Sequence, residues 1–278
     1  MILASRRAAL SGFMGLCVDG LMGRVGLAAA EVATRRSVTI VAGRGQSTKA
    51  FLSLPDRLPA PAVLTIHDSL GLSDWYKSRA QDLAREGFIG LAIDLFPGRL
   101  ARDPDAEEQF IAAADRDHLA IRNSLVACID WLRRDPRTNG RIGVLGWSFG
   151  AWWALQTSLA APTDCTVLYY GLKYGVPGAA EKEILDLSHL KGPLLAHFGE
   201  FDTSIPMDRI DRFWAELKAA GKPAEIDIYP ANHGFGNPSA YGYDREAAIV
   251  AWKRTVNFLR SSLGPPAAPT DGAQNAER

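Results

Sequence analysis

Residues 146–153 read GWSFGAWW and contain the pattern Gly-x-Ser-x-Gly. An apolar run at residues 142–145 precedes this stretch, and helical spacing of apolar residues continues from 151 to 160. The stretch therefore marks a point where a buried strand passes directly into a helix, and its two glycines permit a sharp turn. Such a turn exposes the Ser148 hydroxyl at the helix N-terminus, whose free N–H groups stabilise developing negative charge. The alternative is a chance turn in a glycine-rich chain.

Strand and helix signals alternate on both sides of this stretch. Strands are expected at residues 38–41, 49–54, 62–66, 89–93, 142–145, 166–170, 193–198 and 224–229. Helices are expected at residues 75–86, 104–134, 151–160, 207–220 and 247–263. This alternation predicts one α/β domain over residues 37–263, with a doubly wound, mostly parallel sheet and helices on both faces. The Pro- and Ala-rich residues 264–278 are expected to form a disordered tail.

The composition narrows the class of partner. The 278 residues carry 31 basic and 31 acidic side chains, a net charge of zero that argues against nucleic acid or an anionic membrane as the main partner. Cys17, Cys128 and Cys165 have no metal-ligand or disulfide-framework spacing, so no metal site is predicted. Cys128 and Cys165 are interpreted as small core residues. No organic cofactor is implied either.

The first 30 residues have the features of an export signal. Paired arginines, Arg6 and Arg7, precede a mildly apolar Gly/Ala-rich stretch, and small residues at Ala28 and Ala30 fit a cleavage site before Glu31. The pattern resembles a twin-arginine signal and predicts a periplasmic or secreted protein. The alternative is an amphipathic N-terminal helix on a cytoplasmic protein. No other segment reaches the roughly 18 uninterrupted apolar residues of a membrane span.

A serine nucleophile needs a base and an acid, and two residues lie where these are expected. An alcohol is a poor nucleophile at neutral pH unless a base accepts its proton. At a turn of this type the acid and then the histidine follow the serine in the chain, each after a strand. Asp202 follows the strand at 193–198, and His233 follows the strand at 224–229. Ser148, Asp202 and His233 are therefore predicted to form a catalytic triad.

Other residues compete for these two roles. Glu200 lies beside Asp202, but Asp202 is preferred because two further residues past the strand leave room for the loop to turn toward the histidine. His118 and His189 fall in helical or irregular segments, away from strand ends. His197 lies inside an apolar strand and is interpreted as a packed core histidine.

The loop after the strand at 62–66 is expected to complete an oxyanion hole. The backbone N–H of Ser69, together with that of Phe149, is predicted to bind the oxyanion. For His67 and Asp68, simple turn chemistry is an alternative to a role at the site, and for Asp68 both remain open. Five aromatic residues near the nucleophile either wall an acyl pocket or belong to the core: Trp147, Trp152, Trp153, Tyr169 and Tyr170.

Several segments together resemble the dienelactone hydrolase (carboxymethylenebutenolidase) family of α/β-hydrolases. They are residues 67–72, 92–96, 146–150, 199–202 with Pro206, and 229–235. The resemblance extends over residues 37–263. It implies the α/β-hydrolase fold and hydrolysis of an ester or lactone bond in a small molecule.

The chain departs from this family at three places. Ser148 stands where the family usually has a cysteine nucleophile, and Asp68 stands where it usually has a glutamate next to the oxyanion donor. Arg99 could match one of the arginines that hold a substrate carboxylate in the family, although it could equally be a solvated surface cation. Asn237 stands at the other arginine position. Asp68, Arg99 and Trp147 are the candidate substrate-binding residues.

Together these features predict a serine hydrolase of ester or lactone bonds that acts through an acyl-enzyme. Ser148 attacks, His233 transfers the proton, and Asp202 orients the histidine. Two other functions remain open: an acyl-peptide or amide hydrolase that uses the same triad, and a non-catalytic binding protein with the hydrolase fold.

Overall fold

An eight-stranded, mostly parallel sheet forms the centre of the protein. The computed structural model describes residues 35–42, 46–172 and 186–264, so the predicted export signal and nearly all of the predicted tail lie outside the described residues. The strands are β1 (Arg35–Ala42), β2 (Gln46–Ser53), β3 (Ala60–Ile66), β4 (Ile89–Asp94), β5 (Thr138–Trp147), β6 (Cys165–Tyr169), β7 (Leu194–Gly199) and β8 (Ala224–Tyr229). Their order is β1-β2-β4-β3-β5-β6-β7-β8. Strand β2 runs antiparallel to both neighbours, and the other neighbouring pairs are parallel, as predicted.

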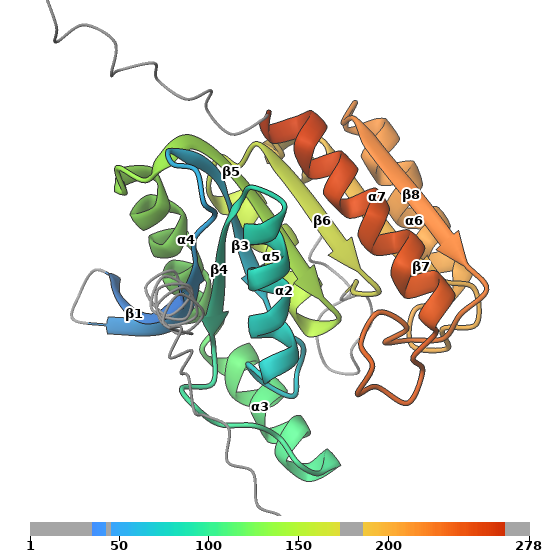
Figure 1. The fold of residues 1–278 in the computed structure, drawn as a ribbon. Coiled ribbons are helices and arrows are strands. Elements are labelled where there is room, and N and C mark those ends of the chain that lie inside the picture. The colour runs from blue at the N-terminus through green and yellow to red at the C-terminus, as the bar shows by residue number, and fades with distance from the viewer. Residues whose placement is uncertain (1–34, 43–45, 173–185, 265–278) are drawn as a thin grey trace, which may run out of the picture. The chain divides into compact units, whose positions relative to one another are not determined.

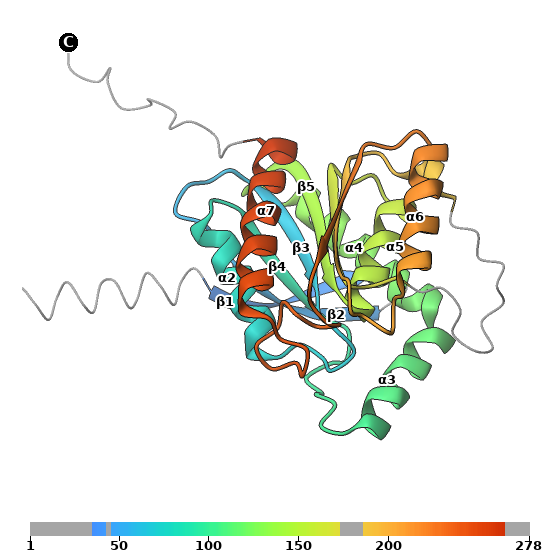
Figure 2. The same ribbon diagram turned by 90° about the vertical axis from the view of Figure 1, so that its right-hand side faces the viewer.

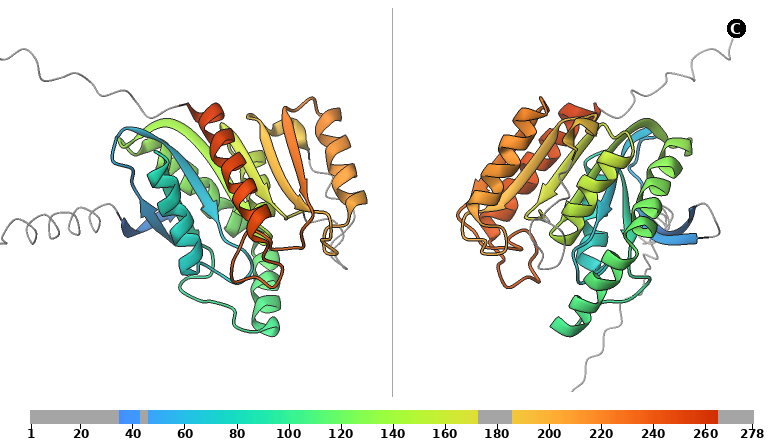
Figure 3. Two further views of the ribbon diagram at one scale, coloured as in Figure 1. Left: turned by 45° about the vertical axis from the view of Figure 1, so that its right-hand side comes forward. Right: turned by 180° about the vertical axis from the view of Figure 1, so that it is seen from behind.

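Helices cover both faces of this sheet. They are α2 (Asp74–Arg85), α3 (Pro104–Arg116), α4 (His118–Arg134), α5 (Phe149–Ala160), α6 (Met207–Ala219) and α7 (Arg245–Leu263), with a short 3-10 turn at Leu187–His189. Helices α2 and α7 lie on one face, and α4, α5 and α6 lie on the other (Figures 1, 2 and 3). Across the described ranges, no helix is both long and apolar enough to cross a membrane.

The central strands are buried on both faces, which explains their continuous apolar sequences. Every residue of β3 is buried. Because successive side chains of a strand point to opposite faces, Leu64 enters the core under α4 and α5, whereas Val63 enters the core under α2 and α7. The same alternation places Val144 and Leu145 of β5 in opposite cores. The sheet therefore carries a separate hydrophobic core on each face.

The single long helix predicted for residues 104–134 is wrong, because α3 and α4 are separated at Asp117. The backbone of Asp117 has φ −101° and ψ 24°, outside the helical range, and aspartate is a weak helix former. Helix α4 buries an apolar stripe that includes Cys128 and Leu132 against the sheet, whereas α3 buries only Phe110 and Ala114. Helix α3 instead projects at the carboxyl end of the strands (Figure 1), which one straight helix could not do while α4 stays on the sheet.

Helix α5 packs very close to the sheet because glycines lie where the two are in contact. A Cβ atom on Gly150 would lie 2.3 Å from the carbonyl oxygens of both Ile66 and His67. A Cβ atom on Gly146 would lie 2.0 Å from the carbonyl oxygen of Gly150. These backbone contacts leave no room for a side chain, so both glycines of the Gly-x-Ser-x-Gly pattern are required by packing.

We expect Gly150→Ala to lower the free energy of unfolding by about 3 kcal/mol, because the added methyl group meets rigid backbone on β3. Gly140 provides a matched control, since it has a left-handed backbone with φ 85° but no atom lies within 4 Å of the position that a Cβ would take there. Gly140→Ala should cost about 1 kcal/mol, the conformational penalty alone. Urea unfolding measures both values, and equal losses would show that the crossing at Gly150 is not a steric constraint.

Candidate active site

Ser148 occupies a strained position between β5 and α5. Its φ of 50° and ψ of −118° are rare for a residue with a side chain. Two hydrogen bonds hold this conformation: the Ser148 N–H donates to the Tyr169 carbonyl at 2.8 Å, and the Ser148 carbonyl accepts from the Ala151 N–H at 2.9 Å. Gly171 passes so close that a Cβ there would lie 2.1 Å from the Ser148 carbonyl oxygen. The turn thus persists because its surroundings fix it.

The structure brings Ser148, His233 and Asp202 into one hydrogen-bonded chain. The Ser148 Oγ lies 2.8 Å from His233 Nε2, and His233 Nδ1 lies 2.7 Å from Asp202 Oδ2. The Asp202 side chain is 1% exposed, and its other oxygen accepts hydrogen bonds from the N–H groups of Ser204 and Ile205 at 2.8 and 3.1 Å. The carboxylate acts as an acceptor for Nδ1–H, which leaves Nε2 free to accept the serine proton.

The competing residues lie elsewhere. Glu200 is exposed, and its backbone N–H donates to the Tyr229 carbonyl. His118 is exposed on α4, and His189 is exposed and lies 3.2 Å from Asp186. His197 is fully buried inside β7, as the sequence indicated. Geometry therefore favours Asp202 and His233 over each of their alternatives.

Of the two predicted oxyanion donors, Phe149 directly follows Ser148 in the chain, and Ser69 borders the same open space as Ser148. Phe149 begins α5, so its N–H has no partner within the helix. Ser69 is buried in the loop after β3, and neither N–H takes part in a loop or turn backbone hydrogen bond between described residues. The Ser69 hydroxyl donates to the carboxylate of Glu107, which reaches it from α3. The sequence analysis missed Glu107, because nothing local to α3 indicates that this face of the helix turns toward the site.

Asp68 stabilises the turn, as one of the two interpretations predicted, and it also lines a hollow beside Ser148, where its role in the reaction stays a prediction. Its Oδ1 accepts a hydrogen bond from the Leu70 N–H at 2.9 Å. Burial raises the pKa of the Asp68 carboxyl above its usual value, and the charge of Glu107 contributes to this shift. The Tyr76 hydroxyl and the Leu70 N–H act in the opposite direction, as does His233. The charges of Glu107 and His233 thus act on the pKa of the Asp68 carboxyl in opposite directions.

His67, in its neutral form, anchors the start of this loop. The ring is 1% exposed, its Nδ1–H donates to the Asp68 carbonyl at 2.6 Å, and its Nε2 accepts from the Leu95 N–H at 3.1 Å. Burial lowers the pKa of His67 to about 4. His67 thus ties the loop that carries Ser69 to the end of β4 and does not enter the catalytic hydrogen-bond chain.

Two hollows open beside Ser148 and His233. The first, which we call the apolar hollow, has a volume of about 340 Å³ and is lined by Phe149, Trp152, Trp153, Leu172 and Ile205, with Arg209 also in its wall. The second, which we call the acidic hollow, has a volume of about 520 Å³ and is lined by Asp68, Glu107, Tyr170, Phe201, Asn237 and Tyr241, among others. Glu107 and Tyr170 border both hollows. A substrate with its carbonyl at Ser148 can therefore extend in two directions.

Two of the candidate substrate-binding residues lie away from these hollows. Arg99 is exposed, and its guanidinium stacks on the Phe110 ring at 4.9 Å, where it lines neither hollow. Trp147 is 1% exposed and packs against the rings of Trp75 and Tyr76 on the α2 side. Because side chains alternate along β5, Trp147 points into that core rather than toward the site. Both expectations are therefore corrected.

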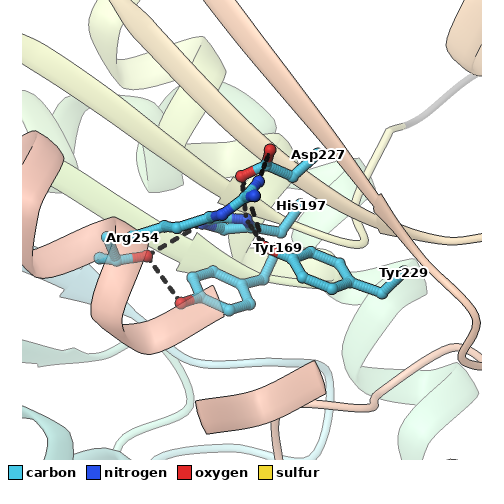
Figure 4. A network of polar contacts seen from close by, with 6 residues as sticks. Tyr169, His197, Asp227, Tyr229 and Arg254 are labelled. Atoms are coloured by element: carbon cyan, nitrogen blue, oxygen red, sulfur yellow. Dashed lines mark hydrogen bonds and ion pairs between the residues drawn. The ribbon is translucent and has the colours of Figure 1, made fainter. Parts of the chain in front are cut away.

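A buried polar network lies beneath the site and joins β6, β7, β8 and α7 (Figure 4). His197 Nε2 lies 3.0 Å from the Thr255 hydroxyl, which lies 2.7 Å from the Tyr169 hydroxyl. His197 Nδ1 lies 3.1 Å from the Tyr229 hydroxyl and 3.5 Å from Asp227, which is paired with Arg254. Burial lowers the pKa of His197 despite the nearby carboxylate. The network links β7 and β8, which precede the loops that carry Asp202 and His233, to β6 and α7.

The described residues contain no group of three or more His, Cys, Asp or Glu side chains placed to hold a metal ion. Cys128 and Cys165 are free and buried, as the sequence indicated. Burial raises the pKa of both thiols, that of Cys128 to about 12.

Comparisons with known proteins identify the family of the chain. Residues 48–263 match the family described as "Dienelactone hydrolase family". Carboxymethylenebutenolidase 1 of Cupriavidus pinatubonensis is 26% identical over 235 residues, which cover 82% of this chain and 97% of that protein. The carboxymethylenebutenolidase of Pseudomonas putida is 27% identical over 231 residues, covering 80% and 94%. A solved structure of a dienelactone hydrolase-like promiscuous phosphotriesterase from metagenomic libraries has the same fold, with a TM-score of 0.73, 22% identity, and coverage of 83% and 99%.

The buried neutral His67 makes stability depend on pH. Its pKa is lower in the folded protein than in the unfolded chain, so its contribution is present above pH 6.5 and is lost as the pH falls toward 4. This group alone should lower the free energy of unfolding by about 2 kcal/mol between pH 7 and pH 5. Urea unfolding of wild type and His67→Gln at both pH values measures the difference.

His197 acts in the same direction, so the His67→Gln variant should keep part of the decrease. His118→Gln, at an exposed histidine, should leave the whole decrease unchanged. An identical decrease in wild type and His67→Gln would contradict the assignment to His67.

Proposed function

Since the chain belongs to the dienelactone hydrolase family, we propose that it hydrolyses ester or lactone bonds of small molecules through an acyl-enzyme at Ser148. The observation that carries this proposal is the continuous hydrogen-bonded chain from Ser148 through His233 to Asp202, which opens on two hollows. The names of the carboxymethylenebutenolidase relatives support the choice of bond.

Acylation begins with attack of the Ser148 Oγ on the substrate carbonyl carbon. The serine proton passes to His233 Nε2 along the existing hydrogen bond. The tetrahedral intermediate then expels the alkoxide, which takes the proton back from His233, and the acyl group stays on the serine. In deacylation, water takes the place of the leaving alcohol, and His233 transfers its proton in the same way.

The negative charge of each tetrahedral intermediate is stabilised by backbone N–H groups. Phe149 contributes the N–H at the start of α5, where the helix dipole adds to the stabilisation. Ser69 contributes the second N–H, and the bond from its hydroxyl to Glu107 fixes the loop. The strained backbone of Ser148 presents Oγ to the substrate without a further conformational change.

Asp202 keeps His233 in the reactive tautomer. Its carboxylate accepts from Nδ1–H and stabilises the imidazolium that forms when Nε2 takes the proton. Two backbone N–H groups, from Ser204 and Ile205, hold the carboxylate in place. The acid therefore stays fixed in position while the histidine changes charge.

Ser148→Ala and His233→Ala should each lower kcat/KM for 4-nitrophenyl acetate by a factor of roughly 10³ or more, because each removes the nucleophile or its base. Asp202→Asn should lower it by roughly 10² or more, because the amide favours the wrong tautomer. A fluorophosphonate probe should label wild type at Ser148 and fail to label Ser148→Ala.

The chain supplies matched controls in the residues that compete by sequence. Glu200→Gln, His118→Ala and His189→Ala remove exposed groups outside the hydrogen-bonded chain and should keep kcat/KM within about twofold of wild type. Near-wild-type activity in both Ser148→Ala and His233→Ala would overturn the proposed function. Absence of probe labelling at Ser148 would indicate a binding protein instead.

A further inference from the structure

The acidic hollow contains negative charge and, among the described residues that line it, no lysine or arginine. Its charged members are Asp68 and Glu107, and both border the space beside Ser148 and His233. Zero net charge over the whole chain does not predict this local imbalance. A group bound in this hollow therefore lies at short range from two carboxylates.

The two carboxylates are close enough to affect each other. Glu107 contributes to the raised pKa of Asp68, and each is fixed by a hydrogen bond from the same loop: Glu107 accepts from the Ser69 hydroxyl, and Asp68 accepts from the Leu70 N–H. Fixed like charges that repel each other are stabilised by a cation placed between or beside them. The arrangement thus favours a positively charged occupant over an anionic one.

The remaining walls suit the same kind of occupant. Phe201 and Tyr241 place exposed aromatic rings in the wall of the hollow, with 54% and 109% exposure, and aromatic faces attract ammonium groups. Tyr170 is 2% exposed and lines the hollow, and its hydroxyl has no hydrogen-bond partner among the described residues. The neutral hydroxyl adds no positive charge to the hollow, so it does not offset the two carboxylates.

The acidic hollow lies on the leaving-group side of the proposed reaction. Asn232 and Gly234, which flank His233, line the acidic hollow but not the apolar one, whereas His233 itself borders both. The apolar hollow has Trp152, Trp153 and Leu172 in its wall, together with the charged residues Glu107, Asp115 and Arg209. His233 must reach the leaving oxygen to protonate it. The alcohol portion of the ester therefore fits the acidic hollow, and the acyl chain fits the apolar hollow.

We propose that the acidic hollow binds leaving groups that carry a positively charged ammonium, and that Glu107 and Asp68 determine this specificity. The inference rests on the proposed function, because it assigns one end of the ester to this hollow. Arg209, a cation in the wall of the site, lines the apolar hollow and lies 3.4 Å from the Ser204 carbonyl, so it does not neutralise the leaving-group side.

Three thioacetates of similar size but different charge test the proposal: acetylthiocholine, its uncharged analogue S-(3,3-dimethylbutyl) thioacetate, and the anionic 3-(acetylthio)propanoate. Release of thiol is followed with a disulfide reagent at low ionic strength. We expect kcat/KM to decrease from the cationic to the neutral to the anionic substrate, with roughly a tenfold difference at each step. Added salt should reduce both ratios.

Glu107→Gln and Asp68→Asn keep an acceptor oxygen for the Ser69 and Leu70 bonds but remove the charge. Each should lower the ratio of kcat/KM for the cationic substrate to that for the anionic substrate by about tenfold. Glu108→Gln is the matched control, because Glu108 is the exposed next residue of α3 and lines neither hollow. It should leave the ratio unchanged.

The outcomes separate this inference from the proposed function. If Ser148→Ala loses activity toward all three thioacetates, the proposed function is retained, whatever charge preference the wild type shows. The inference is overturned if wild type treats the anionic substrate as well as the cationic one, if the ratio is the same in Glu107→Gln and Asp68→Asn as in wild type, or if 4-nitrophenyl acetate is cleaved and none of the thioacetates is.

Discussion

The strained turn at Ser148 is the constraint on which the rest of the site depends. A residue with a side chain occupies a left-handed backbone conformation only when its neighbours leave no alternative. Here the neighbours are backbone atoms, because Gly146, Gly150 and Gly171 each approach another chain segment more closely than any Cβ would allow. The close crossing of α5 over the sheet fixes the turn, and the turn fixes the direction of the serine hydroxyl. The backbone strain at Ser148 and the close packing of α5 on the sheet therefore have the same structural cause.

The buried network around His197 helps to position the other two members of the predicted triad, Asp202 and His233. Two of its members are Tyr169 and Tyr229. The backbone carbonyls of these two tyrosines also accept hydrogen bonds from the loops that carry the predicted triad. The Tyr169 carbonyl accepts from the Ser148 N–H, and the Tyr229 carbonyl accepts from the N–H groups of Glu200 and Ala231, on the acid and histidine loops. A shift of either tyrosine would therefore move a catalytic loop. A neutral buried histidine that bonds on both ring nitrogens suits such a role, because it needs no counter-ion.

The sequence predicted those features that depend on local pattern or on position after a strand. Alternating apolar runs located every strand of the sheet, and the placement of Asp202 and His233 after strands identified residues that the fold brings together. Predictions from the sequence were wrong where the outcome depends on which side of a helix or strand a residue faces. Trp147 and Arg99 were expected at the site but point away from it. Glu107 reaches the site because the helix is interrupted at Asp117, so that α3 lies over the carboxyl ends of the strands.

The acidic surroundings of Ser148 bear on the charges that form during the proposed reaction. A serine stays neutral until attack, so the carboxylates cost it nothing in the resting enzyme. In the proposed mechanism positive charge then appears on His233, to which Asp68 is electrostatically coupled. In that mechanism the same negative field stabilises the imidazolium, and the proposed oxyanion donors, the backbone N–H groups of Ser69 and Phe149, act separately on the oxyanion.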